Sequence, residues 1–419
     1  MKSKFLSIII YLALLLSLTY PYTDFDWGWH YRFGEHFVKT GSVLRQDKFS
    51  WILPNYEWVN HSWGYDILVY WVYSLSGFKG FLYLGPLIMF AIFYISLAPY
   101  KLSAWKVGIL APIYYFGTTS IFNQGLRSQI IGLLLLSLLL NQIRRRPWLS
   151  PLIVLLWVNM HGSFIVGLVI VWLFYIYQSI TKKHSYKLLL ITLLSTLATF
   201  INPFGYKVYT EIFRHLGSPW LQYIYEWRSV EWGISPRNLT LLLVVLLPIA
   251  SFLLSKLNIS IFKWVWFRVG VALIAGYVIS LAVFDRIPSI HFQNYGMKEY
   301  CEFGSRCSPS ILAILKVVPP AGRGFNFYDW GGFLIGGGIK QQIFLYGAMT
   351  LWEKDGYVPF SDSLGIYGGF DKVFNKHNFD WVVIQSSSPL AQKLLSTTDL
   401  GKWKAVFSDM NTLYAVRIP

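Results

Sequence analysis

Long uninterrupted apolar runs recur along the first two thirds of this chain and dominate its pattern. Several of them approach the roughly 20 residues that a helix needs to cross a bilayer core of about 30 Å. The stretch at 63–75 is apolar but short, and it carries Asp66, so it predicts an interfacial helix in an outer loop rather than a crossing. We expect nine transmembrane helices, near residues 5–22, 81–99, 107–121, 129–143, 149–161, 163–180, 188–202, 239–255 and 264–284.

Beyond about residue 285 the pattern changes to short β-like runs separated by turn residues. We expect a helix at 389–395 and strands at 324–327, 343–346, 381–384 and 413–416. Glycine clusters at 331–332 and 336–338 lack the spacing of a dinucleotide-binding fingerprint and predict tight turns. The predicted fold is therefore an α-helical polytopic membrane domain at 1–284, with an outer loop at 23–80, followed by a small α/β domain at 285–419.

Composition and charge agree with this division and give it an orientation. The chain is 55% hydrophobic and only 13% charged, and its mean hydropathy is +0.45, whereas soluble proteins have about 25% charged residues. The net charge of +16 comes largely from short basic loops, which follow the even-numbered predicted spans. The positive-inside rule then places the N-terminus in the cytoplasm and the outer loop and C-terminal domain outside it, in a plasma-membrane protein that does not bind nucleic acid.

The chain has two cysteines, Cys301 and Cys307, and both lie in the predicted C-terminal domain. Two cysteines exclude a disulfide framework or a cysteine-rich metal site. The pair is close enough in sequence to form one bridge if its compartment is oxidising.

Carboxylates follow directly after the first predicted span, where they are costly unless they face water, a partner or a substrate. If this segment is extended, Asp24 and Asp26 point the same way. Together with His30 and His61 they can supply a general base and a charge-stabilising partner, or bind a divalent cation. A solvated loop with interfacial tryptophans is the alternative interpretation.

Further polar residues recur at the outer ends of later predicted helices, namely Arg127, Asn159, His161 and Lys207. Several outer helix ends can therefore line one cavity, although each residue alone also fits an interfacial cap. Arg127 can bind a phosphate through a bidentate fork, and Lys207 as a point charge. No P-loop or comparable motif lies on the inner side, so a cytoplasmic nucleotide site is not indicated.

Six short motifs spread over most of the chain carry a family resemblance: DFDWGWH at 24–30, WVNHSW at 58–63, LRSQ at 126–129, WVNMHG at 157–162, INPFG at 201–205 and YDWGG at 328–332. With these motifs the chain resembles the GT-C superfamily of membrane glycosyltransferases. That superfamily contains protein O-mannosyltransferases and the lipid A aminoarabinose transferase.

The resemblance implies transfer of a sugar from a polyprenyl-phosphate carrier to an acceptor hydroxyl or amine outside the cytoplasm. It implies that Asp24 or Asp26 acts as a base or orients the acceptor, which can be a lipid, a glycan or a protein. Some relatives use a divalent metal and others do not, so metal binding by the two aspartates stays open. The expected ligands of the donor phosphate or of the acceptor are His30, His61, Arg127, Asn159, His161 and Lys207.

Two other functions compete with this one. A transporter or flippase of a lipid-linked substrate would carry charged residues deep within its spans and an internal repeat, and the sequence has neither. A non-catalytic relative that binds a lipid carrier would keep the fold without the chemistry. Replacement of Asp24 and Asp26, followed by measurement of sugar transfer, distinguishes a transferase from both of these alternatives.

Overall fold

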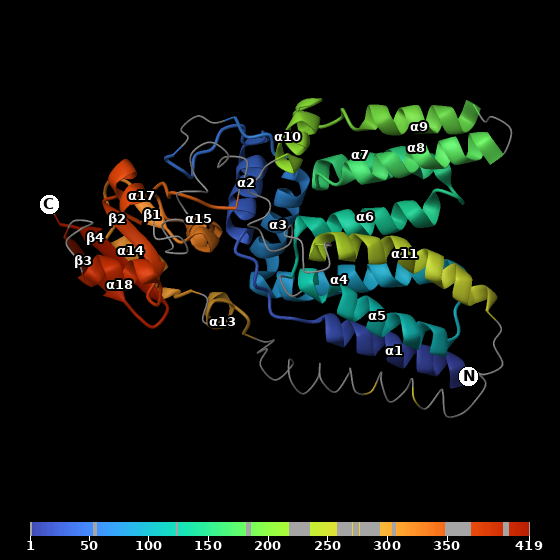
Figure 1. Ribbon diagram of the computed structural model, residues 1–419, viewed down its shortest axis with the longest axis horizontal. Coiled ribbons are helices and arrows are strands. Elements are labelled where there is room, and N and C mark those ends of the chain that lie inside the picture. The colour runs from blue at the N-terminus through green and yellow to red at the C-terminus, as the bar shows by residue number, and fades with distance from the viewer. Residues whose placement is uncertain are drawn as a thin grey trace. The chain divides into compact units, whose positions relative to one another are not determined.

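The computed structural model describes residues 2–52, 57–122, 125–181, 186–217, 235–257, 270, 276, 294–303, 307–347, 370–396 and 402–418. This part of the chain is mostly helical, with a small mixed sheet near the C-terminus (Figure 1). The chain forms two compact units, and each is described here by itself. The first contains Met1–Thr23, Ser76–Val208 and Leu221–Gln293, and the second contains Asp24–Leu75, Tyr209–Trp220 and Asn294–Pro419.

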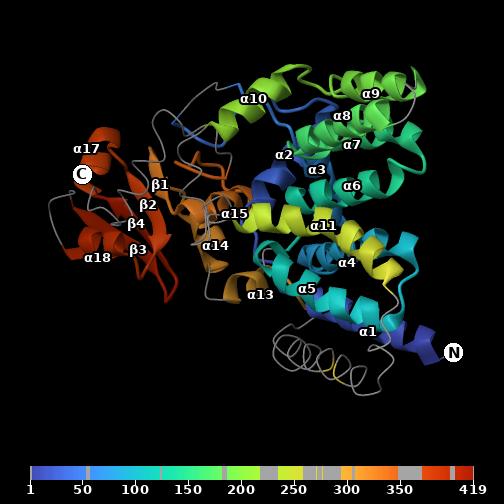
Figure 2. The same cartoon turned by 45° about the vertical axis from the view of Figure 1, so that its right-hand side comes forward.

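The first unit consists of apolar helices that lie side by side, as both views show (Figure 2). They are α1 Lys2–Leu18, α4 Phe78–Leu97, α5 Ala104–Phe122, α6 Ser128–Gln142, α7 Ser150–Met160, α8 Phe164–Thr181, α9 Tyr186–Ala198 and α11 Pro236–Lys256. Helix α10, Lys207–Leu216, begins in this unit and belongs from Tyr209 onward to the second. Every predicted span within the described residues falls on one of these helices. The predicted span at 264–284 lies outside the described residues except at positions 270 and 276.

Three helical segments in the described part are long and apolar enough to cross a membrane: Phe78–Tyr100, Phe164–Thr181 and Asn238–Lys256. Shorter apolar helices cover Phe5–Leu18, Ser128–Gln142, Pro147–Met160 and Tyr186–Ala198. Large apolar side chains point away from the bundle on several helices, and Leu173 and Leu197 are 59% and 61% exposed. Such surfaces suit a hydrocarbon solvent, so the chain has the character of a membrane protein.

Small and hydroxylated residues mark the helix contacts inside this unit. Ser96 on α4 lies 2.9 Å from Ser137 on α6, oxygen to oxygen. A Cβ on Gly117 of α5 would stand 2.0 Å from the end of the Leu243 side chain of α11, so the two helices are in close contact at this glycine. Close approach at small residues and hydrogen bonds between helices are typical of packing inside a membrane, where burial of apolar surface does not drive helices together.

The second unit combines the segment Asp24–Leu75 with the C-terminal part of the chain. This segment, the predicted first outer loop, contributes α2, Trp27–Thr40, and α3, Trp63–Ser76, and α3 covers the predicted interfacial helix. The C-terminal part contributes α13 Met297–Glu302, α14 Ser310–Val317, α15 Gly331–Gly336, α17 Phe370–His377 and α18 Pro389–Ser396. A disulfide joins Cys301 and Cys307.

The C-terminal sheet has the strand order β1-β2-β4-β3. Strand β1, Gly324–Asn326, runs parallel to β2, Trp381–Gln385, while β4, Thr412–Arg417, is antiparallel to both β2 and β3, Trp403–Ser408. The predictions of β1, β2, β4 and α18 are confirmed. Strand β3 was not predicted, because its run is short and interrupted by Lys404.

The predicted strand at 343–346 is wrong. These four residues are completely buried, but they form no strand of the sheet, and only Ile343 makes an isolated bridge, to Ser50. The Asn326 side chain instead donates to the Leu345 carbonyl at 2.7 Å and accepts the N–H groups of Phe344 and Leu345. The run is apolar because these residues are buried on all sides. Side-chain hydrogen bonds pair the backbone groups that a neighbouring strand would otherwise pair.

The turn predicted at 331–332 is also wrong, because Gly331 and Gly332 begin helix α15. A Cβ on Gly28 of α2 would stand 1.8 Å from the Gly332 carbonyl oxygen, so these glycines let the two helices touch. The second cluster does contain a turn, at Gly338, whose φ is +78°.

Candidate functional site

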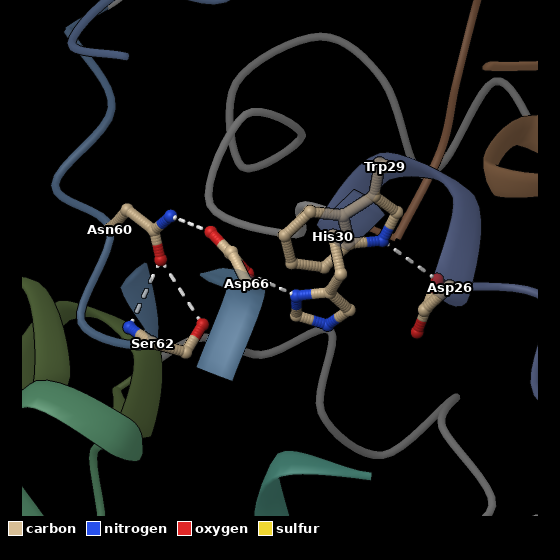
Figure 3. A network of polar contacts seen from close by, with 6 residues as sticks. All are labelled: Asp26, Trp29, His30, Asn60, Ser62 and Asp66. Atoms are coloured by element: carbon tan, nitrogen blue, oxygen red, sulfur yellow. Dashed lines mark hydrogen bonds and ion pairs between the residues drawn. The ribbon is translucent and has the colours of Figure 1, made fainter. Parts of the chain in front are cut away.

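A buried polar network joins the start of α2 to the start of α3 (Figure 3). His30 Nδ1 lies 2.5 Å from Asp66 Oδ1, and Asn60 donates through Nδ2 to Asp66 Oδ2, also at 2.5 Å. Asn60 Oδ1 accepts from the backbone N–H and the hydroxyl of Ser62, at 3.0 and 3.1 Å. Asp66 is 1% exposed and His30 6%. An ionisable pair this deeply buried is a candidate for chemistry.

Close packing between the two helices brings this pair together. Gly34 lies one turn after His30, and a Cβ there would stand 2.1 Å from the Asp66 carbonyl oxygen. Only glycine therefore lets α2 approach the first turn of α3. Asp66 lies in that turn, where the helix dipole favours a carboxylate.

The network fixes the position of its protons. The Ser62 N–H can only donate, so it holds Oδ1 of Asn60 towards itself and turns Nδ2 towards Asp66. When Asp66 is ionised, its carboxylate only accepts, and the proton shared with His30 then lies on Nδ1. The second ring nitrogen of His30 points away from Asp66 (Figure 3) and is the nitrogen available for proton exchange.

Burial and neighbouring charges shift the acid–base behaviour of this segment. Burial raises the pKa of Asp66, against the opposing effects of His30 and Asn60. Burial, with smaller contributions from His215 and His30, lowers the pKa of His61 to about 3. His61 as a whole residue is partly exposed, but its Nδ1 is buried, and the ring is neutral at physiological pH.

The two predicted catalytic aspartates have different environments. Asp24 is 7% exposed, and its Oδ1 accepts the backbone N–H of Asp26 at 3.2 Å. Asp26 is partly exposed, has helical φ and ψ of −73° and −15°, and accepts the indole N–H of Trp29 at 3.0 Å. The extended conformation expected for this pair is therefore not found. Asp24 closes the turn into α2, while Asp26 presents its carboxylate beside Trp29 and the stacked ring of His30.

In the first unit, His161 belongs to a second polar cluster at the junction of α7 and α8. Its Nδ1 accepts the backbone N–H of Ser163 at 3.1 Å and lies 2.7 Å from the Ser163 hydroxyl, which accepts the indole N–H of Trp157. The backbone donor requires Nδ1 to be unprotonated, so neutral His161 carries its proton on Nε2. A Cβ on Gly132 of α6 would reach within 2.7 Å of the same hydroxyl, so the cluster is tightly enclosed.

The other three predicted ligands also belong to the first unit. Asn159 donates to the Ile201 carbonyl at 3.1 Å and so links the end of α7 to the segment after α9. Lys207 is the first residue of α10, and Arg127 directly precedes α6. The glycine of the turn before Arg127, Gly125, lies against the Tyr22 ring.

The structure thus places the predicted residues in two groups, one in each unit. Asp24, Asp26, His30 and His61 lie in the second unit, and Arg127, Asn159, His161 and Lys207 in the first. The convergence of both groups on one cavity stays a prediction. Among the described residues, no three His, Cys, Asp or Glu side chains are grouped as they would be around a metal ion.

Sequence reasoning did not select Asp66 or Asn60 as candidate site residues. Asp66 is the only ionisable acid in the apolar stretch at 63–75, and an acid in such a helix usually has a functional partner. That signal pointed to Asp66, but its partner lies 36 residues away in sequence, so the pair appears only in the fold.

Comparison with known proteins gives no relative for this chain: no family model matches it, and no curated protein is similar to it.

Proposed function

We propose that this chain is a membrane glycosyltransferase that moves a sugar from a polyprenyl-phosphate carrier to an acceptor outside the cytoplasm. The observation that carries the proposal is the buried His30–Asp66–Asn60 network beside Asp26, in the segment that follows the first apolar helix. Paired acid–base groups with low exposure and a shifted pKa are typical of active sites.

In the proposed reaction the acceptor hydroxyl or amine attacks the anomeric carbon of the carrier-bound sugar. Asp26 takes the acceptor proton as the new bond forms, because it is the more accessible aspartate. The bond between the anomeric carbon and the phosphate oxygen breaks, and the departing polyprenyl phosphate keeps the electron pair. His30, held by Asp66, is a second group that can accept or return a proton through Nε2.

The departing phosphate needs cationic or hydrogen-bonding groups as its charge develops. Arg127, Lys207 and the fixed Nε2–H of His161 are the proposed ligands, with Asn159 and His61 as neutral partners. Each is tested by its own variant, since loss of a phosphate ligand weakens donor binding as well as turnover.

The proposal includes nine membrane crossings in the plasma membrane, a cytoplasmic N-terminus and an extracytoplasmic C-terminal domain. The short basic loops support this orientation, because they fall on one side when the spans alternate. The Cys301–Cys307 disulfide also supports it, because such bonds persist in oxidising compartments.

Replacement of Asp24 and Asp26 by asparagine, one at a time, tests the catalytic assignment. We expect Asp26→Asn to abolish sugar transfer in isolated membranes, and Asp24→Asn to reduce it less because its amide oxygen can still accept the Asp26 N–H. Full activity in both variants contradicts the assignment. Movement of the intact donor across vesicles without transfer favours a flippase instead.

A further inference from the structure

Gly347, which follows the buried segment at 343–346, lies directly against the carboxylate of Asp26. A Cβ on Gly347 would stand 1.9 Å from Asp26 Oδ1, 2.6 Å from Cγ and 3.0 Å from Oδ2. All three carboxylate atoms therefore face the α-carbon of Gly347, and any larger residue would occupy their place. Oδ1 is also the atom that accepts the Trp29 indole N–H.

The chain leading to Gly347 is held from two sides. The Ser50 hydroxyl donates to the Phe344 carbonyl at 2.8 Å, and the Tyr346 hydroxyl donates to Asp47 at 2.9 Å. Asp47 is itself fixed by the backbone N–H groups of Phe49 and Ser50. From the end of strand β1, the Asn326 side chain accepts the Phe344 N–H and donates to the Leu345 carbonyl. The backbone leading into Gly347 is therefore firmly held.

We propose that Gly347 is a positioning residue: it holds the Asp26 carboxylate in place against the Trp29 indole, so that the C-terminal domain supplies one wall of the catalytic segment. This inference rests on the proposed function, in which Asp26 is the base. It gives the C-terminal domain a role inside the site, in addition to any contact it makes with an acceptor.

An alanine at 347 separates positioning from folding. Gly347 is not among the described glycines with positive φ, so alanine can adopt its backbone conformation. The added methyl meets only the end of the short Asp26 side chain, which can rotate away, whereas the backbone leading into 347 is pinned. Gly28 differs, because its Cβ would meet the Gly332 carbonyl oxygen at 1.8 Å and only backbone movement could relieve that contact. Gly347→Ala therefore folds and displaces the carboxylate.

The test compares Gly347→Ala with Gly296→Ala, whose new Cβ has its nearest neighbour at an ordinary 3.4 Å. In purified full-length protein we expect Gly347→Ala to lower kcat roughly 100-fold while KM for the donor is unchanged, because a displaced base affects the reacting state and not ground-state binding. Gly296→Ala retains wild-type values. The Asp26→Ala variant has no activity to lose, so in that background the effect of Gly347→Ala is measured by thermal unfolding.

Wild-type kcat in Gly347→Ala would overturn the positioning role. Thermal unfolding of the wild type, Gly347→Ala, Asp26→Ala and the double variant provides a readout that does not require activity. Gly347→Ala should lower Tm in the wild-type background and lower it less in Asp26→Ala, whereas equal shifts contradict the contact. If the wild-type chain transfers no sugar, the proposed function fails, and the unfolding cycle still decides whether Gly347 positions Asp26.

Discussion

Replacing Asp66 by asparagine should move a proton from one side of His30 to the other. Asparagine has one acceptor oxygen where the carboxylate has two, and the Asn60 Nδ2 group, fixed by Ser62, requires that oxygen. The new amide NH₂ then faces His30 Nδ1, which must accept and lose its proton. Neutral His30 therefore changes from the Nδ1–H tautomer to the Nε2–H tautomer, and its outward nitrogen changes from acceptor to donor.

The size of the effect follows from the two contacts that Asp66 makes. Hydrogen bonds to a charged group contribute roughly 1.5–3 kcal/mol each, and asparagine keeps both in neutral form, so we expect Asp66→Asn to lower the free energy of unfolding by about 1–3 kcal/mol. Asp66→Ala leaves His30 and Asn60 buried without an acceptor and should cost about 3–5 kcal/mol. Loss of the correct tautomer should reduce sugar transfer by roughly 10²- to 10⁴-fold.

The assay combines thermal unfolding, sugar transfer and ¹⁵N NMR of histidine-labelled protein, with the His30 signals assigned through His30→Gln. Glu302→Gln is the control, because Glu302 is 61% exposed and lies 3.7 Å from Lys298; such a surface pair contributes about 0–1 kcal/mol. A His30 proton that stays on Nδ1 in Asp66→Asn, or an Asp66→Ala variant as stable as the wild type, would refute the protonation scheme.

Three further predictions concern stability and sidedness. Burial lowers the pKa of His61 to about 3 from a usual 6.5, so below pH 6.5 the unfolded chain binds a proton that the folded chain does not. Stability therefore falls as the pH drops from 6.5 towards 3. Unfolding measured across this pH range should show a shallower fall in His61→Gln, and equal slopes contradict the burial of this ring. Gly34→Ala should destabilise the protein by about 1–3 kcal/mol, because its methyl group meets the Asp66 backbone. An unchanged Tm in thermal unfolding argues against the close contact between α2 and α3. Met410→Cys, at a position that is 93% exposed, should react with a membrane-impermeant maleimide on intact cells, and labelling that needs permeabilised cells reverses the proposed orientation.

Much of the architecture is predictable from local pattern, because long apolar runs and alternating β-like runs directly reflect the solvent around each element. The helices of the first unit, the strands β1, β2 and β4, and the helix α18 all follow from it. The segment at 343–346 does not, because full burial gives the same apolar run whether a strand or side chains pair its backbone. Likewise, glycines at 331–332 suit a turn and a close helix contact equally well in sequence.

The candidate site is only partly predictable. The accessible Asp26 and the buried His30 both lie in the DFDWGWH motif at 24–30, but their partners are distant in sequence. Asp66 follows His30 by 36 positions, and Gly347 lies in the C-terminal domain. Sequence periodicity describes neighbours on one element, whereas these contacts depend on how elements pack, so no local pattern contains them.

Cleavage of a defined donor by purified protein tests the central claim most directly. The full-length chain in lipid nanodiscs is incubated with a panel of polyprenyl-phosphate-linked sugars and a membrane extract that supplies acceptors, and release of free polyprenyl phosphate is measured by mass spectrometry. We expect release with at least one donor by the wild type, and none by Asp26→Ala. Donors that all remain intact, or release that is equal in Asp26→Ala, would contradict a glycosyltransferase that uses the first outer segment as its active site.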